Sequence, residues 1–254
     1  MIRGLYQTAS GMIAQQVRQE VIGENLANAR TPGFKGQTVT MRTFPELMLY
    51  RMAGKQAQPL APYVHGVMAD GLHINFAPGA LQQTGRSTDL ALVSTRSDAP
   101  PAFFAVQAGG QERFTRHGGF RVDGEGFLVT PQGYQVLGED GPLWIGQQEF
   151  TVTADGRVLI DDDVIGQLAI VAFAQPGLLQ RQGENLFTAP PAAGLEIARD
   201  YTVQQGFLEG ANVDLVGELV QMLSVLRSFE AGQKTIWAMD SILGQAVNEI
   251  GRVK

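Results

Sequence analysis

The chain has 254 residues, 44% of them hydrophobic and 17% charged, so it can bury a sizeable core, and its composition indicates neither a disordered chain nor a membrane protein. Its formal net charge is −6, and it has no run of Lys and Arg interleaved with aromatic residues, which argues against nucleic acid as a partner. The absence of cysteine excludes disulfides, thiolate catalysis and Cys-ligated zinc.

The first 36 residues predict an amphipathic helix that ends in a turn. Apolar side chains recur at helical spacing as far as Leu26. Thr31-Pro32-Gly33 then ends the helix, because proline disfavours helical backbone in the residue before it and Pro-Gly favours a turn. Polar residues between positions 15 and 20 interrupt the apolar pattern, so we expect neither a secretory signal nor a membrane span here.

Residues 37 to 78 follow a less regular pattern. Prolines at positions 45, 59, 62 and 78 break any long element. We therefore expect an extended connector between the N-terminal helix and the next domain, with contacts between subunits along it.

Residues 79 to 187 predict a β-rich domain of hairpins. Residues 120 to 129 and 150 to 160 each alternate apolar and polar side chains on both sides of a turn that contains Asp-Gly. Further strands are expected at 90–93, 103–107, 134–137 and 167–173, the last of which is nearly all apolar and should be buried on both faces. A small β-sandwich or barrel-like domain is expected.

Two other stretches are expected to lack long strands. Ser94 to Pro101 is a loop by composition, because two consecutive prolines are incompatible with a central strand. Residues 188 to 212 are expected to be a second connector, which leads to the C-terminal helix.

Residues 213 to 254 predict a long helix, with Asn212 or Asp214 as its N-cap. Eleven positions recur at alternating spacings of four and three, and nine of them are apolar, as in a heptad seam: Leu215, Leu219, Met222, Leu226, Phe229, Gln233, Ile236, Asp240, Leu243, Val247 and Ile250. The two polar members either fix the register and the number of partners or face solvent. Further apolar residues widen the stripe, so the helix should contact several neighbours.

The sequence offers no motif for catalysis or for metal binding. Asp155 and residues 161 to 163 lack the spacing and the closing Glu of a calcium loop. The three histidines, at positions 65, 73 and 117, have no zinc-binding spacing, and no phosphate-binding loop or nucleophile motif occurs. We expect no enzyme, no catalytic residue, no cofactor and no metal.

Several motifs resemble those of one protein family. Ser10-Gly11-Met12, Asn25-Leu26-Ala27-Asn28 and Thr31-Pro32-Gly33-Phe34-Lys35 resemble the N-terminal signature of the bacterial flagellar basal-body rod and hook proteins. The resemblance continues through Gly79 to Leu92, Phe114 to Gly138, Gln182 to Phe187 and Gly206 to Val253. The length of the chain favours the rod branch that includes the distal-rod protein and its proximal-rod relative.

The chain departs from this family in two places. Glu24-Asn25 stands where members often have two asparagines, which places a charge near the end of the first helix. From Ser94 to Phe104, a longer loop replaces the short glycine-bearing turn that the family tends to place before a Phe-Phe pair, so the surface of the β domain should differ.

The resemblance implies an α+β fold in which the N- and C-terminal helices form a coiled-coil-like domain joined to a central all-β domain of hairpins. It also implies a structural subunit that self-assembles helically into the axial rod, together with other rod and hook proteins, and transmits torque. Such a subunit would be exported by the flagellar type III apparatus and would lie outside the cytoplasmic membrane, in the periplasm or cell wall, without membrane insertion.

The expected assembly interface has twelve residues: Asn25, Leu26, Asn28, Pro32, Gly33, Phe34, Leu219, Met222, Leu226, Phe229, Ile236 and Leu243. From the sequence alone, the same residues could instead form a capped helix, a turn and the core of an isolated bundle. The alternative function is a secreted β-rich binding module or adhesin-like protein with a helical oligomerisation domain. Growth into open-ended polymers would favour the rod subunit, whereas a small oligomer of fixed size would favour the module.

Overall fold

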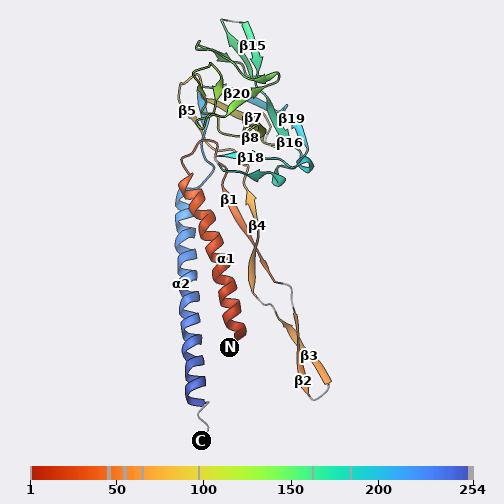
Figure 1. The fold of residues 1–254 in the computed structure, drawn as a ribbon, viewed down its shortest axis with the longest axis vertical. Helices are drawn as coiled ribbons and strands as arrows, with labels where there is room; N and C mark the ends of the chain where they lie inside the picture. The colour runs from red at the N-terminus through yellow and green to blue at the C-terminus, as the bar shows by residue number, and fades with distance from the viewer. Residues whose placement is uncertain are drawn as a thin grey trace. The chain divides into compact units, whose positions relative to one another are not determined.

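The computed structural model describes residues 2–44, 47–53, 56–63, 66–96, 98–161, 163–183 and 185–250. It has a helix near each end of the chain and β-strands between them, which confirms the expected α+β class (Figure 1). The chain divides into two compact units. The helical unit contains Met1–Ala27, Gln37–His73 and Asp214–Lys254, and the β unit contains Asn28–Gly36 and Ile74–Val213.

Two antiparallel helices dominate the helical unit. α1 (Ile2–Ala27) ends just before the predicted turn, in which the amide of Thr31 donates to the carbonyl of Asn28. α2 (Leu215–Gln245) is capped by Asp214, whose carboxylate accepts from the amide of Val216, and it continues into the π-helix η3 (Ala246–Ile250). The predicted N-cap at Asp214 is thus confirmed.

The helical unit also contains two-stranded ribbons. β1 (Gln37–Thr43) pairs with β4 (Val67–Ile74), and β2 (Leu47–Ala53) pairs antiparallel with β3 (Gln56–Tyr63). Most of the stretch expected to be an extended connector is therefore paired strand. Prolines 59 and 62 fit inside β3 because a two-stranded ribbon has an outer edge where a missing N–H breaks no ladder.

The β unit is built around a ten-stranded sheet. Seven strands follow one another in the order β17 (Gln180–Arg181), β18 (Leu186–Thr188), β8 (Gln111–Thr115), β7 (Ala102–Ala108), β11 (Gln135–Gly138), β10 (Leu128–Val129) and β9 (Arg121–Val122). The other three branch from this path: β12 (Gly141–Pro142) pairs with β11, β16 (Ile170–Phe173) pairs with β7, and β19 (Leu195–Ile197) pairs with β16.

Smaller sheets complete the β unit. They are β13 (Thr151–Val152) with β14 (Arg157–Ile160) and β15 (Asp163–Gln167), β6 (Leu90–Ser94) with β20 (Tyr201–Gln205), and β5 (Leu81–Gln83) with β21 (Phe207–Glu209). Two short 3₁₀ turns, η1 (Pro176–Leu178) and η2 (Pro191–Ala193), lie in the connections. The stretch expected to be a second connector thus holds strands β19 to β21, which pair with strands far away in the sequence.

Both predicted hairpins are confirmed. β9 and β10 pair antiparallel with Val122 opposite Leu128, and β13 and β14 pair with Val152 opposite Val158. The strands expected at 90–93, 103–107 and 134–137 correspond to β6, β7 and β11. The expected loop connects β6 to β7, although Ser97 within it lies outside the described residues.

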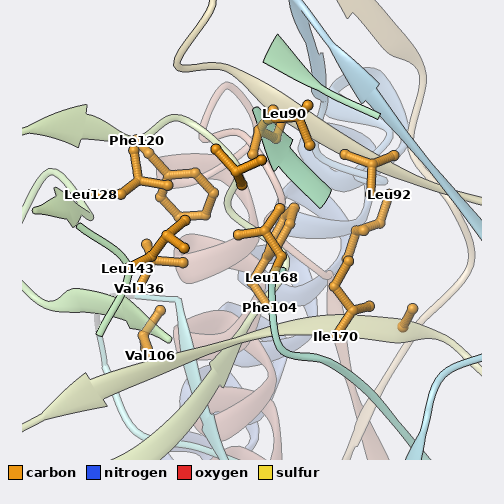
Figure 2. Close-up of a cluster of buried hydrophobic side chains, with 14 of the residues drawn as sticks. Leu90, Leu92, Phe104, Val106, Phe120, Leu128, Val136, Leu143, Leu168 and Ile170 are labelled. Carbon is orange, nitrogen blue, oxygen red and sulfur yellow. The ribbon is translucent and has the colours of Figure 1, made fainter. Parts of the chain in front are cut away.

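The alternation of β7 divides the core of the β unit in two. Phe104 and Val106 join a cluster with Leu90, Phe120 and other apolar residues (Figure 2). Phe103 and Ala105 point into a second cluster, where aromatic rings pack with centroids 4.9 to 5.7 Å apart. Since successive side chains of a strand point to opposite faces, the Phe103-Phe104 pair anchors both clusters at once.

Candidate assembly interface

A heptad pattern on α2 marks the face that packs against α1. Between residues 218 and 246, the buried and half-buried positions alternate at spacings of four and three: Glu218, Met222, Val225, Phe229, Gly232, Ile236, Met239, Leu243 and Ala246. We call this set the inner seam.

Two glycines let the helices approach closely. A Cβ atom on Gly232 would lie 2.7 Å from Cγ of Met12, and one on Gly4 would lie 2.8 Å from Cε of Met239. Each helix thus presents a methionine to a glycine of its partner. The two contacts fix the antiparallel register, because a shift by one turn would separate both pairs.

The inner seam overlaps only in part with the seam predicted from the sequence. Met222, Phe229, Ile236 and Leu243 belong to both. Five further residues complete the inner seam: Glu218, Val225, Gly232, Met239 and Ala246. The predicted members Leu215, Leu219, Leu226, Gln233, Asp240 and Val247 are exposed. The apolar stripe is wide enough to contain two heptad registers, which share four positions. The spacing of apolar residues alone does not show which register packs against α1. Gln233 and Asp240 are exposed within the chain, and the side chain of Ile250 lies outside the described residues.

The exposed apolar residues of α2 form a surface of their own. Six of them lie in its first three turns, with exposed fractions of 37 to 69%: Leu215, Val216, Leu219, Val220, Leu223 and Leu226. At about 100° per residue they cover one flank of α2, from the edge of the inner seam round to its opposite side. We call these six residues the outer patch. Exposed apolar patches are typical of surfaces that bind other molecules.

Asn25, expected in the interface between subunits, is buried inside the helical unit. Its amide nitrogen donates to the carbonyl of Gln37 at 2.8 Å and to Oε1 of Glu218 at 2.9 Å, and its oxygen accepts from the amide of Gln37. This side chain therefore joins the end of α1, the start of β1 and the start of α2. Leu26 beside it is half-buried.

The turn after α1 belongs to the β unit and is tightly packed there. Asn28 and Pro32 are half-buried, and Oδ1 of Asn28 accepts from the hydroxyl of Thr31. Gly33 has a φ of +68°, and a Cβ atom there would lie 2.4 Å from the backbone of Arg116, so only glycine fits. Phe34 is buried.

Phe34 is also covered by a cation. The guanidinium of Arg181 lies 4.2 Å from the centre of its ring. This contact and the burial of Gly33 place both residues inside the β unit, so their expected contact with a second subunit remains a prediction.

A buried ion cluster, made of Lys35, Arg116 and Glu209, lies beside this turn. Nζ of Lys35 lies 2.6 Å from Oε1 of Glu209, and Nη2 of Arg116 lies 2.7 Å from Oε2, with side chains at most 4% exposed. Glu209 Oε1 also accepts from the amide of Gly79. The remaining donors of the two cations reach backbone carbonyls, including that of Ala77. Because its polar atoms are paired, the cluster can hold three charges out of water.

Burial and charge act in opposite directions on this cluster. Burial alone would raise the pKa of Glu209, but the charges of Arg116 and Lys35 outweigh it and hold that pKa below its usual value. Burial lowers the pKa of Lys35, and Arg116 adds to this effect while Glu209 opposes it. Glu209 is thus the anion on which both cations depend.

The cluster joins three segments of sequence that share no local pattern. Lys35 and Glu209 are 174 residues apart, and Arg116 and Glu209 are 93 apart. No local pattern in the sequence predicts that these charges meet. The weak signal that could have found them is their occurrence inside three of the motifs that carry the family resemblance.

The loop from Ser94 to Pro101, which departs from the family pattern, borders a cavity of about 540 Å³ in the β unit. Arg116 and Glu209 also line this cavity, together with apolar residues that include Phe76 and Leu92. The departure thus lies next to the ion cluster.

Among the described residues, no three or more His, Asp and Glu side chains form a group that could bind a metal ion. His73 is exposed, His117 is half-buried, and His65 and Asp162 lie outside the described residues. Neither α1 nor α2, as far as they are described, has an apolar stretch long enough to span a membrane.

Three family models match the chain. They describe the flagella basal body rod protein over residues 5–35, the D1 domain of the flagellar hook protein FlgE/F/G over residues 101–160, and the C-terminal region of the flagellar basal body rod FlgEFG proteins over residues 204–249. The first and third matches cover most of α1 and α2, and the second covers both predicted hairpins.

Whole proteins also match from end to end. The flagellar hook-basal body complex protein FlhO of Bacillus subtilis is 32% identical, with 100% of both chains covered. The flagellar basal-body rod protein FlgG of the same species is 32% identical over 98% of this chain and 99% of its own. The rod protein FlgF of Caulobacter vibrioides is 29% identical, again with 100% of both chains covered.

Proposed function

This chain belongs to the flagellar basal-body rod protein family, and we propose that its copies polymerise into the axial rod through the outer patch of α2. It is a structural subunit of the rod and not an enzyme. Relatives named FlgG and FlgF both match it over nearly their whole length, so the similarity extends across the rod branch. Full-length similarity to rod proteins does not favour the alternative of a secreted binding module.

The observation that carries the proposal is the exposure of the outer patch. Complete burial of a Leu or Val side chain is worth roughly 1.5 to 3 kcal/mol, and about half of each side chain in the patch is already covered. Covering the rest should therefore contribute about 1 kcal/mol per residue. Association of two proteins costs roughly 4 to 15 kcal/mol in lost freedom, so one patch alone would hold a pair of subunits weakly. Growth then requires several neighbours at once, which favours addition to an existing end.

The position of the patch supports an open polymer. It lies at the start of α2, whereas the far end of α2 reaches past the start of α1 (Figure 1). The two ends of the helical unit thus present different surfaces. A contact between two unlike surfaces can repeat from copy to copy. It builds an open helical filament unless the rotation at each step closes the copies into a ring.

Several further properties belong to the same proposal. The terminal helices form a coiled-coil-like layer in the assembled rod, and their ordering is coupled to burial by neighbouring copies. The subunit reaches the rod through the flagellar type III export apparatus, lies outside the cytoplasmic membrane in the periplasm or cell wall, and contacts other rod and hook proteins. The rod transmits torque from the motor to the hook.

The test is polymerisation of the purified full-length chain with Leu219 and Leu223 both changed to Asp. We expect the variant to keep the circular dichroism spectrum of the dilute native monomer and to lose sedimentable polymer. Ile197→Asp, at a residue of β19 that is even more exposed, is the matched control and should polymerise normally. Normal polymer from the double variant would remove the basis of the proposal.

A further inference from the structure

One exposed aromatic side chain of the β unit is held firmly in place. The indole of Trp144 is 57% exposed, yet its Nε1 donates to the carbonyl of Glu125 at 2.9 Å. The ring also packs against the backbone of two glycines: a Cβ atom on Gly126 would lie 2.8 Å from Nε1, and one on Gly146 would lie 3.4 Å from Cη2. Because the ring is already fixed, it would lose little conformational freedom on binding to another surface.

The chemistry of Trp144 suits burial in an apolar site. Nε1 is the only polar atom of the side chain, and its hydrogen bond to Glu125 lies within the chain, so a partner could cover the ring without leaving a donor unpaired. Phe127 lies opposite Trp144 in an antiparallel bridge, so both aromatic side chains project from the same face. Trp144 therefore presents an apolar surface that needs no polar partner.

The cavity of about 540 Å³ beside the ion cluster offers a matching site in the same unit. Its walls are mostly apolar and include Phe76, Leu81 and Leu92. Leu81 of β5 is 42% exposed, so this wall can be reached from outside. Ligand pockets usually have about 300 to 1,000 Å³ and mainly apolar walls, so the cavity has room for an indole.

The charges at the two sites are complementary. Lys35, Arg116 and Glu209 are two cations and one anion, so the ion cluster has a formal net charge of +1, and the last two of these residues line the cavity. The turn beside Trp144 contains two carboxylates, those of Asp123 and Glu125, and its residues 123 to 126 include no basic residue. Docking of this turn at the cavity is therefore favoured by charge as well as by polarity.

Trp144 cannot fill the cavity of its own copy. The amide of Leu143 donates to the carbonyl of Val136, and Val136 pairs with Val106, so Trp144 lies near the later part of β7. Pro101, which lines the cavity, comes directly before the start of β7. Pro101 and Val106 are five residues apart, or about 16 Å in an extended strand. The fixed indole and the cavity are therefore separate surfaces of one compact unit.

A fixed aromatic ring and a distant cavity of matching polarity fit a contact between two copies of the chain. We propose that the indole of Trp144 in one copy occupies the cavity lined by Phe76, Leu81 and Leu92 in the next copy, an inference that rests on the proposed polymerisation. The two surfaces differ, so the contact is heterologous and repeats along a polymer. It adds a second point of attachment to the outer patch, which alone holds a pair of subunits weakly.

Photo-cross-linking of the assembled full-length chain tests this placement. We replace Trp144 by p-benzoylphenylalanine and mix isotope-labelled with unlabelled chains. The expected product joins position 144 to a peptide of the other copy that contains Phe76, Leu81 or Leu92. The same amino acid in place of Ile197, which is exposed in the same unit, is the control and should not reach that peptide. Cross-links from position 144 that reach only other surfaces, or none between copies, overturn the inference.

Substitutions on both sides of the contact test its contribution. Trp144→Ala should raise the protein concentration needed for polymerisation about tenfold or more, because a buried Trp is a typical hot spot of an interface. Leu81→Asp changes an exposed residue of the cavity wall and should have a similar effect. Ile197→Ala is the control and should leave this concentration unchanged. The melting temperature of dilute Leu81→Asp monomer should stay near the native value, which separates loss of contact from loss of folding.

A native polymerisation threshold in either variant overturns the inference. The proposed function then stands as long as the variant with Leu219 and Leu223 changed to Asp still loses polymer. If the unmodified chain forms no polymer, the proposed function fails, and the inference fails with it.

Discussion

Gly232 of α2 lies so close to Met12 of α1 that a Cβ atom at position 232 would approach Cγ of Met12 to 2.7 Å. Because this atom belongs to the stem of the methionine and not to its mobile tip, a larger residue cannot be accommodated by a simple rotation of the end of the side chain. The absence of a side chain at position 232 therefore holds the two helices at their separation.

The Gly232→Leu variant should destabilise the helical unit by about 1 to 3 kcal/mol, the usual cost of overpacking. Gly244→Leu is the matched control, since a Cβ atom there meets nothing within 4 Å and replacing a helical glycine is favourable by itself. Thermal unfolding followed by circular dichroism measures both. Equal melting temperatures for the two variants would contradict the close packing at Met12.

Phe229 and Leu226 should behave differently when each is changed to Asp, although the sequence places both on one seam. Phe229→Asp puts a charge in the inner seam, so it should lower the melting temperature of the helical unit. Leu226→Asp lies on the outer patch, so it should block assembly but leave the melting temperature of the dilute monomer nearly unchanged. Melting curves and sedimentation of both variants check this, and similar melting losses would mean that the two faces are not separate.

The ion cluster predicts a large effect at Glu209. Glu209→Gln leaves Lys35 and Arg116 buried without their anion, and removal of one partner of a buried ion pair costs about 3 to 5 kcal/mol. Glu196→Gln, on the exposed strand β19, is the control and should change stability by less than about 0.5 kcal/mol. Urea unfolding of the full chain gives both values. A loss at Glu209 as small as that at Glu196 would show that the cluster does not stabilise the β unit.

His117 should make the β unit sensitive to mild acid. Its Nδ1 accepts from the amide of Gly119, and burial lowers its pKa below 6.5, with Asp89 opposing the shift. Because the pKa of His117 is lower in the folded state than in the unfolded state, the neutral imidazole contributes to the free energy of unfolding. This contribution is fully present above about pH 6.5 and is lost as the pH falls through the folded-state pKa.

The measurement for His117 is the melting temperature between pH 7.5 and 5. The native chain should lose stability over this range, and His117→Asn should lose clearly less. His73→Asn, at an exposed histidine, should follow the native curve. A native curve that stays level down to pH 5 would contradict a lowered pKa for His117.

Limited proteolysis of the dilute monomer should release a resistant core larger than residues 79 to 187. Residues 28 to 36 and those up to 213 belong to the β unit, because Lys35 and Glu209 are paired and the side chain of Asn212 accepts from the amide of Gly36. The helical ends should be cut first, since amphipathic helices are marginal without neighbours. Mass mapping of the fragments checks the boundaries, and helical ends as resistant as the core would show that ordering is not coupled to assembly.

The sequence predicted the local parts of this fold well. The turns that contain Asp123 and Asp155 located two hairpins, because alternation about a glycine-bearing turn is a signal of neighbouring residues. The end of α1 followed from Thr31-Pro32-Gly33 for the same reason. Strands β19 and β21, with three residues each, carry too little pattern of their own and exist because of distant partners.

The candidate interface was predictable only in part. The period of the apolar stripe on α2 gave four members of the inner seam, but a wide stripe does not say which register faces α1. That choice depends on Gly232 and Met12, whose fit is a property of the packed pair. Nothing in the sequence around Asn25 indicates that its side-chain amide forms hydrogen bonds with the backbone of Gln37.

The bonds between the entry and exit segments of the β unit set the path that a mechanical load takes. Gly33 donates to the carbonyl of Glu209, Gly36 donates to Asn212, and the ion cluster joins the same two segments. Tension applied through residues 28 and 213 is therefore borne by these bonds, and the hairpins in between lie outside the loaded path. Loops outside that path, such as the one after Ser94, can therefore lengthen without making the connection between residues 28 and 213 more compliant.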